Sequence, residues 1–240
     1  MSRLIIGKNA TREALLSGKA EALYLQSEIK EFVELAKKKN VPIHIVKKEK
    51  LDSMTKENHQ GVIAMAKDFK YYQINELVDG CDDSLIVILD GLKDPHNLGA
   101  ILRTCEATKV SGVVITKNRS VHLSDTVSKV STGAMELVKV SEVTNLSQTI
   151  DYLKDQGYWV VGAEHEKRSQ NYWSLDYNMK IALVIGSEGE GISRLVKEKC
   201  DFLVDIPMMG RINSLNASVS TALIIYEIRR KQLNKWGVNR

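Results

Sequence analysis

The sequence predicts an α/β protein built around a largely parallel sheet. Segments typical of strands alternate with segments typical of helices from one end of the chain to the other. Residues 85–89 form a continuous apolar run, as expected for a strand that is buried on both faces. With 240 residues, 43% of them hydrophobic and 27% charged, the chain can bury a substantial core. This composition excludes disordered, collagen-like and coiled-coil proteins.

The first seventy residues are expected to form a small α/β domain, which we place at residues 1–68. Asn9 is the expected N-cap of its first helix, and a run of lysines ends its second. The expected strands cover residues 3–6, 22–26, 42–46 and 61–66, and the expected helices cover residues 9–16, 29–38 and 49–55.

Residues 69–84 are expected to link this domain to a larger one at residues 85–240, because the stretch is polar, has no long apolar period and carries an acidic end. The last helix is the longest of the larger domain, with apolar residues at helical spacing over residues 214–236. The other expected elements are strands at 85–89, 112–116, 137–140, 158–163, 181–185 and 202–206, and helices at 98–108, 125–130, 146–156 and 193–199.

The small net charge is concentrated in the first third of the chain. Thirty-four Lys and Arg against 30 Asp and Glu give a formal charge of +4, which permits a nucleic-acid partner without requiring one. Residues 1–70 hold 14 basic and 9 acidic side chains, whereas residues 71–240 hold 20 and 21. The lysines at 37–39 and 47–48 are candidates for phosphate contacts, the alternative being an ordinary solvated face.

Cysteine usage and hydropathy indicate a soluble cytoplasmic protein without a bound metal. Cys81, Cys105 and Cys200 lie far apart with no CxxC spacing, so neither a zinc site nor a disulfide framework is expected. The apolar run near the N-terminus is too short for a signal peptide. No uninterrupted apolar stretch approaches the ~18 residues of a membrane span.

Three polar segments each follow an expected buried strand, where open α/β sheets usually bind ligands. In the first, residues 90–103, Asn97 is either a helix N-cap or part of a pocket for an anionic or polar substrate. Arg103 either lines that same pocket or is a solvated helix residue. His96 is either a base or a turn residue.

The second segment is GSEGEG, residues 186–191, whose glycines permit positive φ and close backbone approach to a ligand. Its glycine spacing, G-x-x-G-x-G, is the reverse of the G-x-G-x-x-G spacing of dinucleotide-binding loops. In addition, Glu188 and Glu190 would repel a pyrophosphate. An adenosine or a zwitterion fits better, the alternative being a glycine-rich turn with two solvated acids.

The third segment, residues 206–218, joins the last strand to the last helix. Ser214, Asn216 and Ser218 provide more hydrogen-bonding side chains than one N-cap requires, which suggests a second use for them. No histidine lies near a G-x-S-x-G elbow, so a Ser-His-Asp hydrolase is disfavoured.

Taken in order, DPHNLGAILRTCEA, IGSEGEGIS and IPMMGRINSLNASVSTALIIYE resemble the three motifs of the SpoU-type RNA ribose 2′-O-methyltransferases of the SPOUT superfamily. Residues 1–66, with HQGV at residues 59–62 near their end, resemble the small L30e-like substrate-binding domain of the two-domain bacterial members. The layout is most similar to the enzymes that methylate a guanosine of 23S ribosomal RNA.

The resemblance implies a trefoil-knotted SPOUT domain at residues 85–240, an exception to the general absence of knots. It also implies an obligate homodimer, RNA as substrate, no DNA partner and S-adenosylmethionine as the methyl donor. The positions that match the family's cofactor site are Gly186, Ser187, Ile206, Met208 and Leu215, and those that match its catalytic cluster are Asn97, Arg103, Glu188, Ser214 and Asn216.

Methyl transfer to a ribose hydroxyl is an in-line displacement by a poorly acidic nucleophile, so orientation and stabilisation of the forming alkoxide should dominate. A guanidinium with a pKa above ~12 is a poor base, so Arg103 is expected to stabilise the 2′-oxygen or a neighbouring phosphate. Asn97, Ser214 and Asn216 are expected to orient the ribose, and Glu188 to position partners at its loop.

The function expected is therefore 2′-O-methylation of a guanosine in 23S ribosomal RNA. The alternatives are a tRNA guanosine 2′-O-methyltransferase and a non-catalytic RNA-binding protein for ribosome assembly. The presence of Asn97, Arg103 and Asn216 argues against the non-catalytic alternative.

Overall fold

The computed structural model describes residues 2–211 and 213–235 as two compact units that divide after Phe69. The first unit is a mixed four-stranded sheet of order β1–β4–β2–β3, in which β4 is antiparallel to both β1 and β2, and β3 is parallel to β2. Its elements are β1 (Ser2–Ile6), α1 (Lys8–Leu16), β2 (Ala20–Leu25), α2 (Lys30–Lys38), β3 (Ile43–Ile45), α3 (Lys48–Met54) and β4 (Val62–Lys67).

One core holds the first unit together. The helices α1 and α2 bury Leu15 and Phe32 against apolar residues of β2 and β4. The HQGV turn before β4 depends on His59, which is 6% exposed. Its Nδ1 accepts a hydrogen bond from the Gly61 N–H at 2.9 Å, so the proton on Nε2 is donated to Asp52 Oδ1, also at 2.9 Å.

The second unit is built on a seven-stranded sheet of order β7–β6–β5–β10–β8–β11–β9, in which every neighbouring pair is parallel. The predicted α/β fold with a mostly parallel sheet is therefore confirmed. Its strands are β5 (Leu85–Asp90), β6 (Gly112–Thr116), β7 (Val140–Val143), β8 (Trp159–Ala163), β9 (Gln170–Asn171), β10 (Ile181–Gly186) and β11 (Phe202–Asp205).

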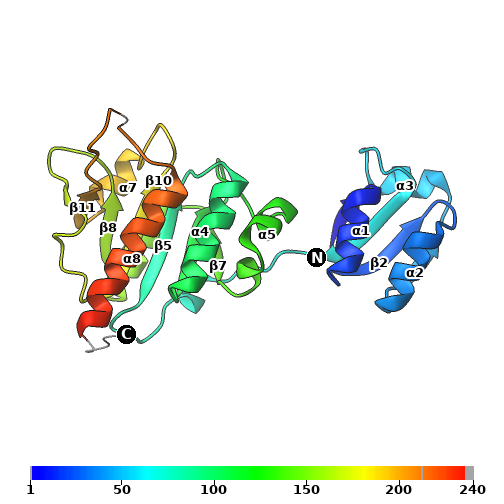
Figure 1. Ribbon diagram of the computed structural model, residues 1–240, viewed down its shortest axis with the longest axis horizontal. Helices are drawn as coiled ribbons and strands as arrows, with labels where there is room; N and C mark the ends of the chain where they lie inside the picture. Colours follow the sequence, from blue (N-terminus) through cyan, green and yellow to red (C-terminus); the bar gives the residue numbers. More distant parts are fainter. Residues whose placement is uncertain (1, 212, 236–240) are drawn as a thin grey trace. The chain divides into compact units, whose positions relative to one another are not determined.

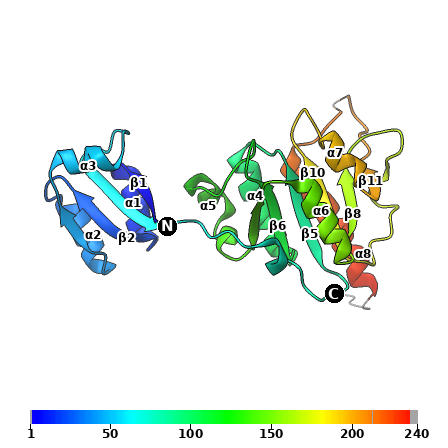
Figure 2. The ribbon, with the colours of Figure 1, turned by 180° about the vertical axis from the view of Figure 1, so that it is seen from behind.

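Helices cover both faces of this sheet, which explains why β5 and β10 are apolar up to their last residue. Figure 1 shows α4 and α8 over one face, with α5 beside α4, and Figure 2 shows α6 and α7 over the other face. The bounds are α4 (Pro95–Ala107), α5 (Asp125–Ser131), α6 (Leu146–Asp155), α7 (Arg194–Glu198) and α8 (Ala217–Lys235), with 3-10 turns at Ile74–Glu76 and Ala134–Glu136.

The strand order reverses next to β5. The chain first moves outward through β6 and β7 and then crosses to β8 on the other side of β5, with β10 inserted between β5 and β8. Ligands of open α/β sheets bind at the carboxyl ends of the strands beside such a reversal. The carboxyl ends of β5, β10, β8 and β11 are therefore where the site is expected.

Residues 70–84, which the sequence predicts to be a link, pack against the larger unit. The Tyr72 N–H donates to the Val140 carbonyl at 2.8 Å. Leu77 is 1% exposed and lies over Gly112, where any Cβ would overlap it. In a mostly polar segment that buries one leucine in this way, the spacing of apolar residues is too irregular to show from the sequence that the segment packs against a domain.

Several element boundaries also differ from the prediction. The strand expected at 137–140 begins instead at Val140, because a 3-10 turn precedes it and leaves Leu137 72% exposed. The two-residue strand β9 is too short to show a pattern. The helix α8 begins at Ala217, so residues 214–216 stay in the loop, and its expected end at Trp236 lies outside the described residues.

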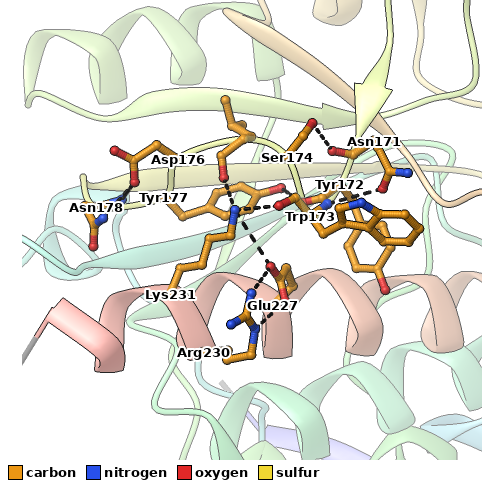
Figure 3. A network of polar contacts seen from close by, with 11 residues as sticks. Asn171, Tyr172, Trp173, Ser174, Asp176, Tyr177, Asn178, Glu227, Arg230 and Lys231 are labelled. Carbon is orange, nitrogen blue, oxygen red and sulfur yellow. Dashed lines mark hydrogen bonds and ion pairs between the residues drawn. The ribbon is translucent and has the colours of Figure 1, made fainter. Parts of the chain in front are cut away.

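The segment that follows β9 is fastened to α8 by one lysine (Figure 3). Lys231 Nζ donates to the carbonyls of Trp173 at 2.6 Å and Leu175 at 2.8 Å. The Tyr177 hydroxyl donates to the Tyr172 carbonyl at 2.7 Å, and burial raises the Tyr177 pKa.

Of the helices described, α8 included, none combines the length and apolar character needed to cross a membrane.

Candidate functional site

Asn97 is the centre of a polar cluster at the carboxyl ends of β5 and β10. Its side chain is 6% exposed, and it lies in the first turn of α4, directly after the turn that leaves β5. Its Nδ2 donates to Glu188 Oε1, and its Oδ1 accepts from Asn216 Nδ2 at 2.9 Å. One buried amide thus connects the three segments that the sequence singles out.

Asn97 is free for this role because another residue caps α4. The Asp94 carboxylate accepts from the His96 N–H at 3.0 Å, and Pro95 occupies the first helical turn, where its missing N–H is tolerated. The N-cap interpretation of Asn97 is therefore wrong. His96 itself is exposed.

The loop after β10 owes its shape to its glycines. Gly186 faces the backbone of Gly191 so closely that any Cβ would overlap it, and Ser187 pairs with Gly191 through two backbone hydrogen bonds. Gly189 and Gly191 adopt positive φ values of 95° and 67°. The resulting tight loop presents Glu188 to Asn97.

Two carboxylates hold this loop from both sides. Asp90 Oδ2, at the end of β5, accepts from the Ser193 N–H at 2.8 Å. Glu164 Oε2, after β8, accepts from the Ile192 N–H at 3.0 Å. Lys197 pairs with Glu164 Oε1 at 3.3 Å and with a second glutamate, Glu166, which raises the Lys197 pKa. These contacts fix the loop before any ligand arrives.

Asn216 links the cluster to the last helix. Its Oδ1 accepts from the Ser218 N–H at 2.9 Å and from the Ser218 hydroxyl at 2.6 Å, so it caps α8 while its Nδ2 bonds to Asn97. Ser218 serves this cap. Ser214 is exposed and lies in the loop before Asn216.

A pocket of about 420 Å³ opens beside the cluster, over the carboxyl ends of β8 and β11. It combines apolar side chains with the carboxylates of Glu164 and Asp205, and His165 Nδ1 lies 2.9 Å from Asp205 Oδ2 at its rim. Four of the expected site residues line it: Ile206, Met208, Ser214 and Leu215. Gly186 is not among its lining residues, and Ser187 lines a second pocket nearby.

Arg103 stands apart from the cluster. It is exposed on α4, six residues after Asn97, and at ~100° per residue the two side chains point about 120° apart around the helix axis. It makes no polar contact within the described part of the chain. A single chain thus brings together Asn97, Glu188 and Asn216 but leaves Arg103 outside.

Three carboxylates that frame the site are not among the residues predicted from the sequence. Asp90, Glu164 and Asp205 each end or follow a buried strand, so the rule that ligands bind at the carboxyl ends of parallel strands could have identified them. Among residues 2–211 and 213–235, no group of three or more His, Cys, Asp or Glu is placed to hold a metal ion.

Both units of the chain match known protein families. The model of the SpoU rRNA methylase family matches residues 84–226, and a model described as RNA 2′-O ribose methyltransferase substrate binding matches residues 4–72. Among curated proteins, one from Staphylococcus haemolyticus is 46% identical over 95% of this chain and 96% of its own length. It carries the provisional name TrmH family tRNA/rRNA methyltransferase.

Solved structures show the same fold. The SpoU methyltransferase AviRb from Streptomyces viridochromogenes, in complex with AdoMet, superposes with a TM-score of 0.71 at 22% identity, covering 97% of this chain and 91% of AviRb. A TrmH/SpoU tRNA modifying enzyme from A. aeolicus is 31% identical, with a TM-score of 0.60, over 68% of this chain and 82% of its own. The matches to both units and the extent of the likeness to curated relatives establish that this chain belongs to the SpoU rRNA methylase family.

Proposed function

We propose that this protein transfers a methyl group from S-adenosylmethionine to the 2′-oxygen of a guanosine ribose in 23S ribosomal RNA. The observation that carries the proposal is the Asn97–Glu188–Asn216 cluster, which lies at the carboxyl edge of the sheet beside a pocket of about 420 Å³. Family membership supports the reaction class and a cytoplasmic location.

The pocket fits the methyl donor in size and chemistry. Its volume is within the ~300–1,000 Å³ of small-molecule sites. Apolar side chains of Ile206, Met208 and Leu215 suit an adenine ring, and the carboxylate of Asp205 suits a hydroxyl or ammonium donor. When bound, S-adenosylmethionine would supply an electrophilic methyl group on a sulfonium.

The chain's own residues would orient the nucleophile. The amide of Asn97 is held on both sides, by Glu188 and by Asn216, so its position is set in advance. Such preorganisation lowers the cost of aligning a hydroxyl for in-line attack. Arg103 would stabilise negative charge on the 2′-oxygen or a nearby phosphate, because a guanidinium stays protonated at neutral pH.

We further propose that the active protein is a homodimer, in which a partner chain covers α8. One face of α8 packs on the sheet through Ile224, Ile225 and Ile228, which are at most 1% exposed. The opposite face carries an exposed apolar stripe at heptad-like spacing: Val219, Leu223, Tyr226 and Leu233, each 40–56% exposed. A helix that is apolar on both faces is normally buried on both.

The dimer would also explain why Arg103 lies outside the polar cluster of a single chain. This residue lies on α4, which packs against α8, and it makes no polar contact in the described part of one chain. Light scattering on Leu223→Asp tests the interface: a monomeric variant is expected, and an unchanged dimer would contradict the use of α8.

The trefoil knot belongs to this proposal as well. The loop that enters α8 ends at Asn216, and the Asn216–Asn97 hydrogen bond joins this loop to α4 across 119 residues of sequence. A crystal structure of the methyl-donor complex would test the knot by tracing residues 206–216 through the connections around β10.

We propose that residues 1–68 capture RNA. The match of residues 4–72 to a substrate-binding family and the excess of five positive charges in residues 1–70 support this role. A tRNA guanosine substrate is the second candidate, because the curated relative's name covers tRNA and rRNA and the A. aeolicus protein is a tRNA modifying enzyme.

Ribose methylation should be mapped in 23S ribosomal RNA and tRNA from cells with and without the gene. Loss of one methyl mark in 23S RNA is expected, and loss in tRNA instead would favour the second candidate. With purified protein, Arg103→Ala should abolish methyl transfer and leave the dimer intact. The matched control is Arg194→Ala, because Arg194 is 83% exposed on α7 and pairs only loosely with Glu198. Full activity of the Arg103 variant, or failure to bind S-adenosylmethionine, would refute the assignment.

A further inference from the structure

A second pocket, of about 600 Å³, lies on the other side of the polar cluster. It opens over the carboxyl ends of β6, β5 and β10, whereas the pocket assigned to the methyl donor opens over β8 and β11. Its lining is formed by the turns after the three strands and includes Asp90, Lys93, Arg119, Ser187 and Glu190.

This pocket and the cluster share their supporting segments. Lys93 lies four residues before Asn97, and Ser187 and Glu190 flank Glu188 on the same loop. The cluster is linked through Asn216 to Ser214 and Leu215 of the first pocket. The cluster therefore lies between two pockets, which is the arrangement that transfer between two bound molecules requires.

Three charged side chains of this pocket have no partner in the described residues. Lys93, Arg119 and Glu190 are exposed, and none of them makes a hydrogen bond or ion pair there. The other carboxylate, Asp90, is already engaged by the Ser193 N–H at 2.8 Å. The pocket thus offers two free cations and one free carboxylate.

The turn that carries Arg119 is itself unusual. Arg119 has a φ of 59°, in the left-handed region that non-glycine residues seldom adopt. The hydroxyls on either side stabilise the turn, since Thr116 Oγ1 donates to the Asn118 carbonyl at 3.0 Å and Ser120 Oγ donates to the Leu92 carbonyl at 3.1 Å. The turn places Arg119 at the edge of the pocket that it lines.

We propose that this pocket binds the guanosine nucleotide that is to be methylated. Lys93 and Arg119 contact its phosphates, and Glu190 accepts hydrogen bonds from the N1–H and the N2 amino group of the base. Guanine is the base whose Watson–Crick edge presents two adjacent donors, which match the two oxygens of a carboxylate. The assignment rests on the proposed ribose methylation, which it deepens by naming the residues that select the base.

The first test measures binding without turnover. The protein is saturated with S-adenosylhomocysteine and titrated with guanosine 5′-monophosphate or inosine 5′-monophosphate, which lacks only the N2 amino group. Backbone amide shifts locate and quantify the binding. Guanosine monophosphate should perturb the amide shifts of residues 116–120 and 187–193. It should bind about tenfold more tightly than inosine monophosphate, because a side chain that pairs with two groups on a base edge discriminates against a base that lacks one of them to about this extent.

The variants separate base reading from phosphate contact. Glu190→Ala should reduce the preference for guanosine monophosphate to within about threefold, and Arg119→Ala should weaken both nucleotides equally. Glu198→Ala on α7 and Lys117→Ala, two residues before Arg119, are the matched controls, because neither residue lines the pocket. Perturbations elsewhere, or an unchanged preference in Glu190→Ala, would overturn the proposal.

The second test uses turnover on an RNA oligonucleotide that carries the mapped target with guanosine or inosine at that position. The ratio of kcat/KM between the two should fall about tenfold in Glu190→Ala while S-adenosylmethionine affinity is unchanged. Methyl transfer with an unchanged ratio overturns the pocket assignment and leaves the enzyme assignment standing. Nucleotide binding that depends on Glu190, without methyl transfer by the wild type, supports the pocket and refutes the proposed function.

Discussion

Arg229 is the residue whose removal should most clearly test how the larger unit is held together. Its guanidinium bridges the last helix to two distant segments. It donates to the carbonyls of Thr108 at 2.8 Å, Lys109 at 2.6 Å and Asp83 at 2.7 Å, and to Gln232 Oε1 at 2.7 Å. Burial lowers the Arg229 pKa, which shows that desolvation opposes this arrangement and that the hydrogen bonds must offset it.

Arg229→Met keeps the apolar stem and leaves three backbone carbonyls without their donor. A hydrogen bond to a charged group contributes about 1.5–3 kcal/mol, and water can replace part of it because Arg229 is only half-buried. We therefore expect a loss of about 3 kcal/mol for the whole set. At about 2–4 °C per kcal/mol for a unit of this size, the melting temperature should fall by roughly 6–12 °C.

Urea unfolding followed by tryptophan fluorescence measures this loss in the larger unit alone, because the three tryptophans of the chain all lie beyond residue 158. The matched control is Arg230→Met. Arg230 is the next residue, has a side chain that is 58% exposed and bonds only to Glu227 on its own helix, so it should cost less than about 1 kcal/mol. Equal losses in the two variants, at one protein concentration, would refute the reasoning.

Three other outcomes follow from the structure. Gly186→Ala should abolish S-adenosylmethionine binding, measured by calorimetry, because a Cβ would overlap the Gly191 backbone, whereas Gly80→Ala, which meets nothing within 4 Å, should bind normally. A maleimide at pH 8 should label exposed Cys81 but not Cys200, because burial raises the pKa of the Cys200 thiol to about 12. Rapid labelling of two thiols in the folded protein would contradict this expectation. Reversing the charges of Lys37, Lys38 and Lys39 should weaken RNA binding. The slope of the logarithm of the affinity against the logarithm of the salt concentration should fall by roughly one unit per lost phosphate contact. Unchanged affinity in a filter-binding titration would exclude this helix end from the RNA interface.

The sequence by itself determined the fold class and most of the elements. The apolar runs of β5 and β10 and the alternation of strands and helices are local patterns, and each is produced by the burial of the segment that carries it. The glycine spacing of residues 186–191 likewise anticipates a tight loop. The motif residues were identified in the sequence because they are polar where the scaffold alone would need no polar group.

Only the tertiary structure decided which of these residues work together. The Asn97–Asn216 hydrogen bond spans 119 positions, and the loop of Glu188 is fastened by Asp90 and Glu164 from two other strands. Neither periodicity nor spacing encodes such contacts, because they arise where the strand order reverses and brings separate turns to one edge of the sheet. The same holds for residues 70–84, whose packing depends on Leu77 fitting over a glycine of β6.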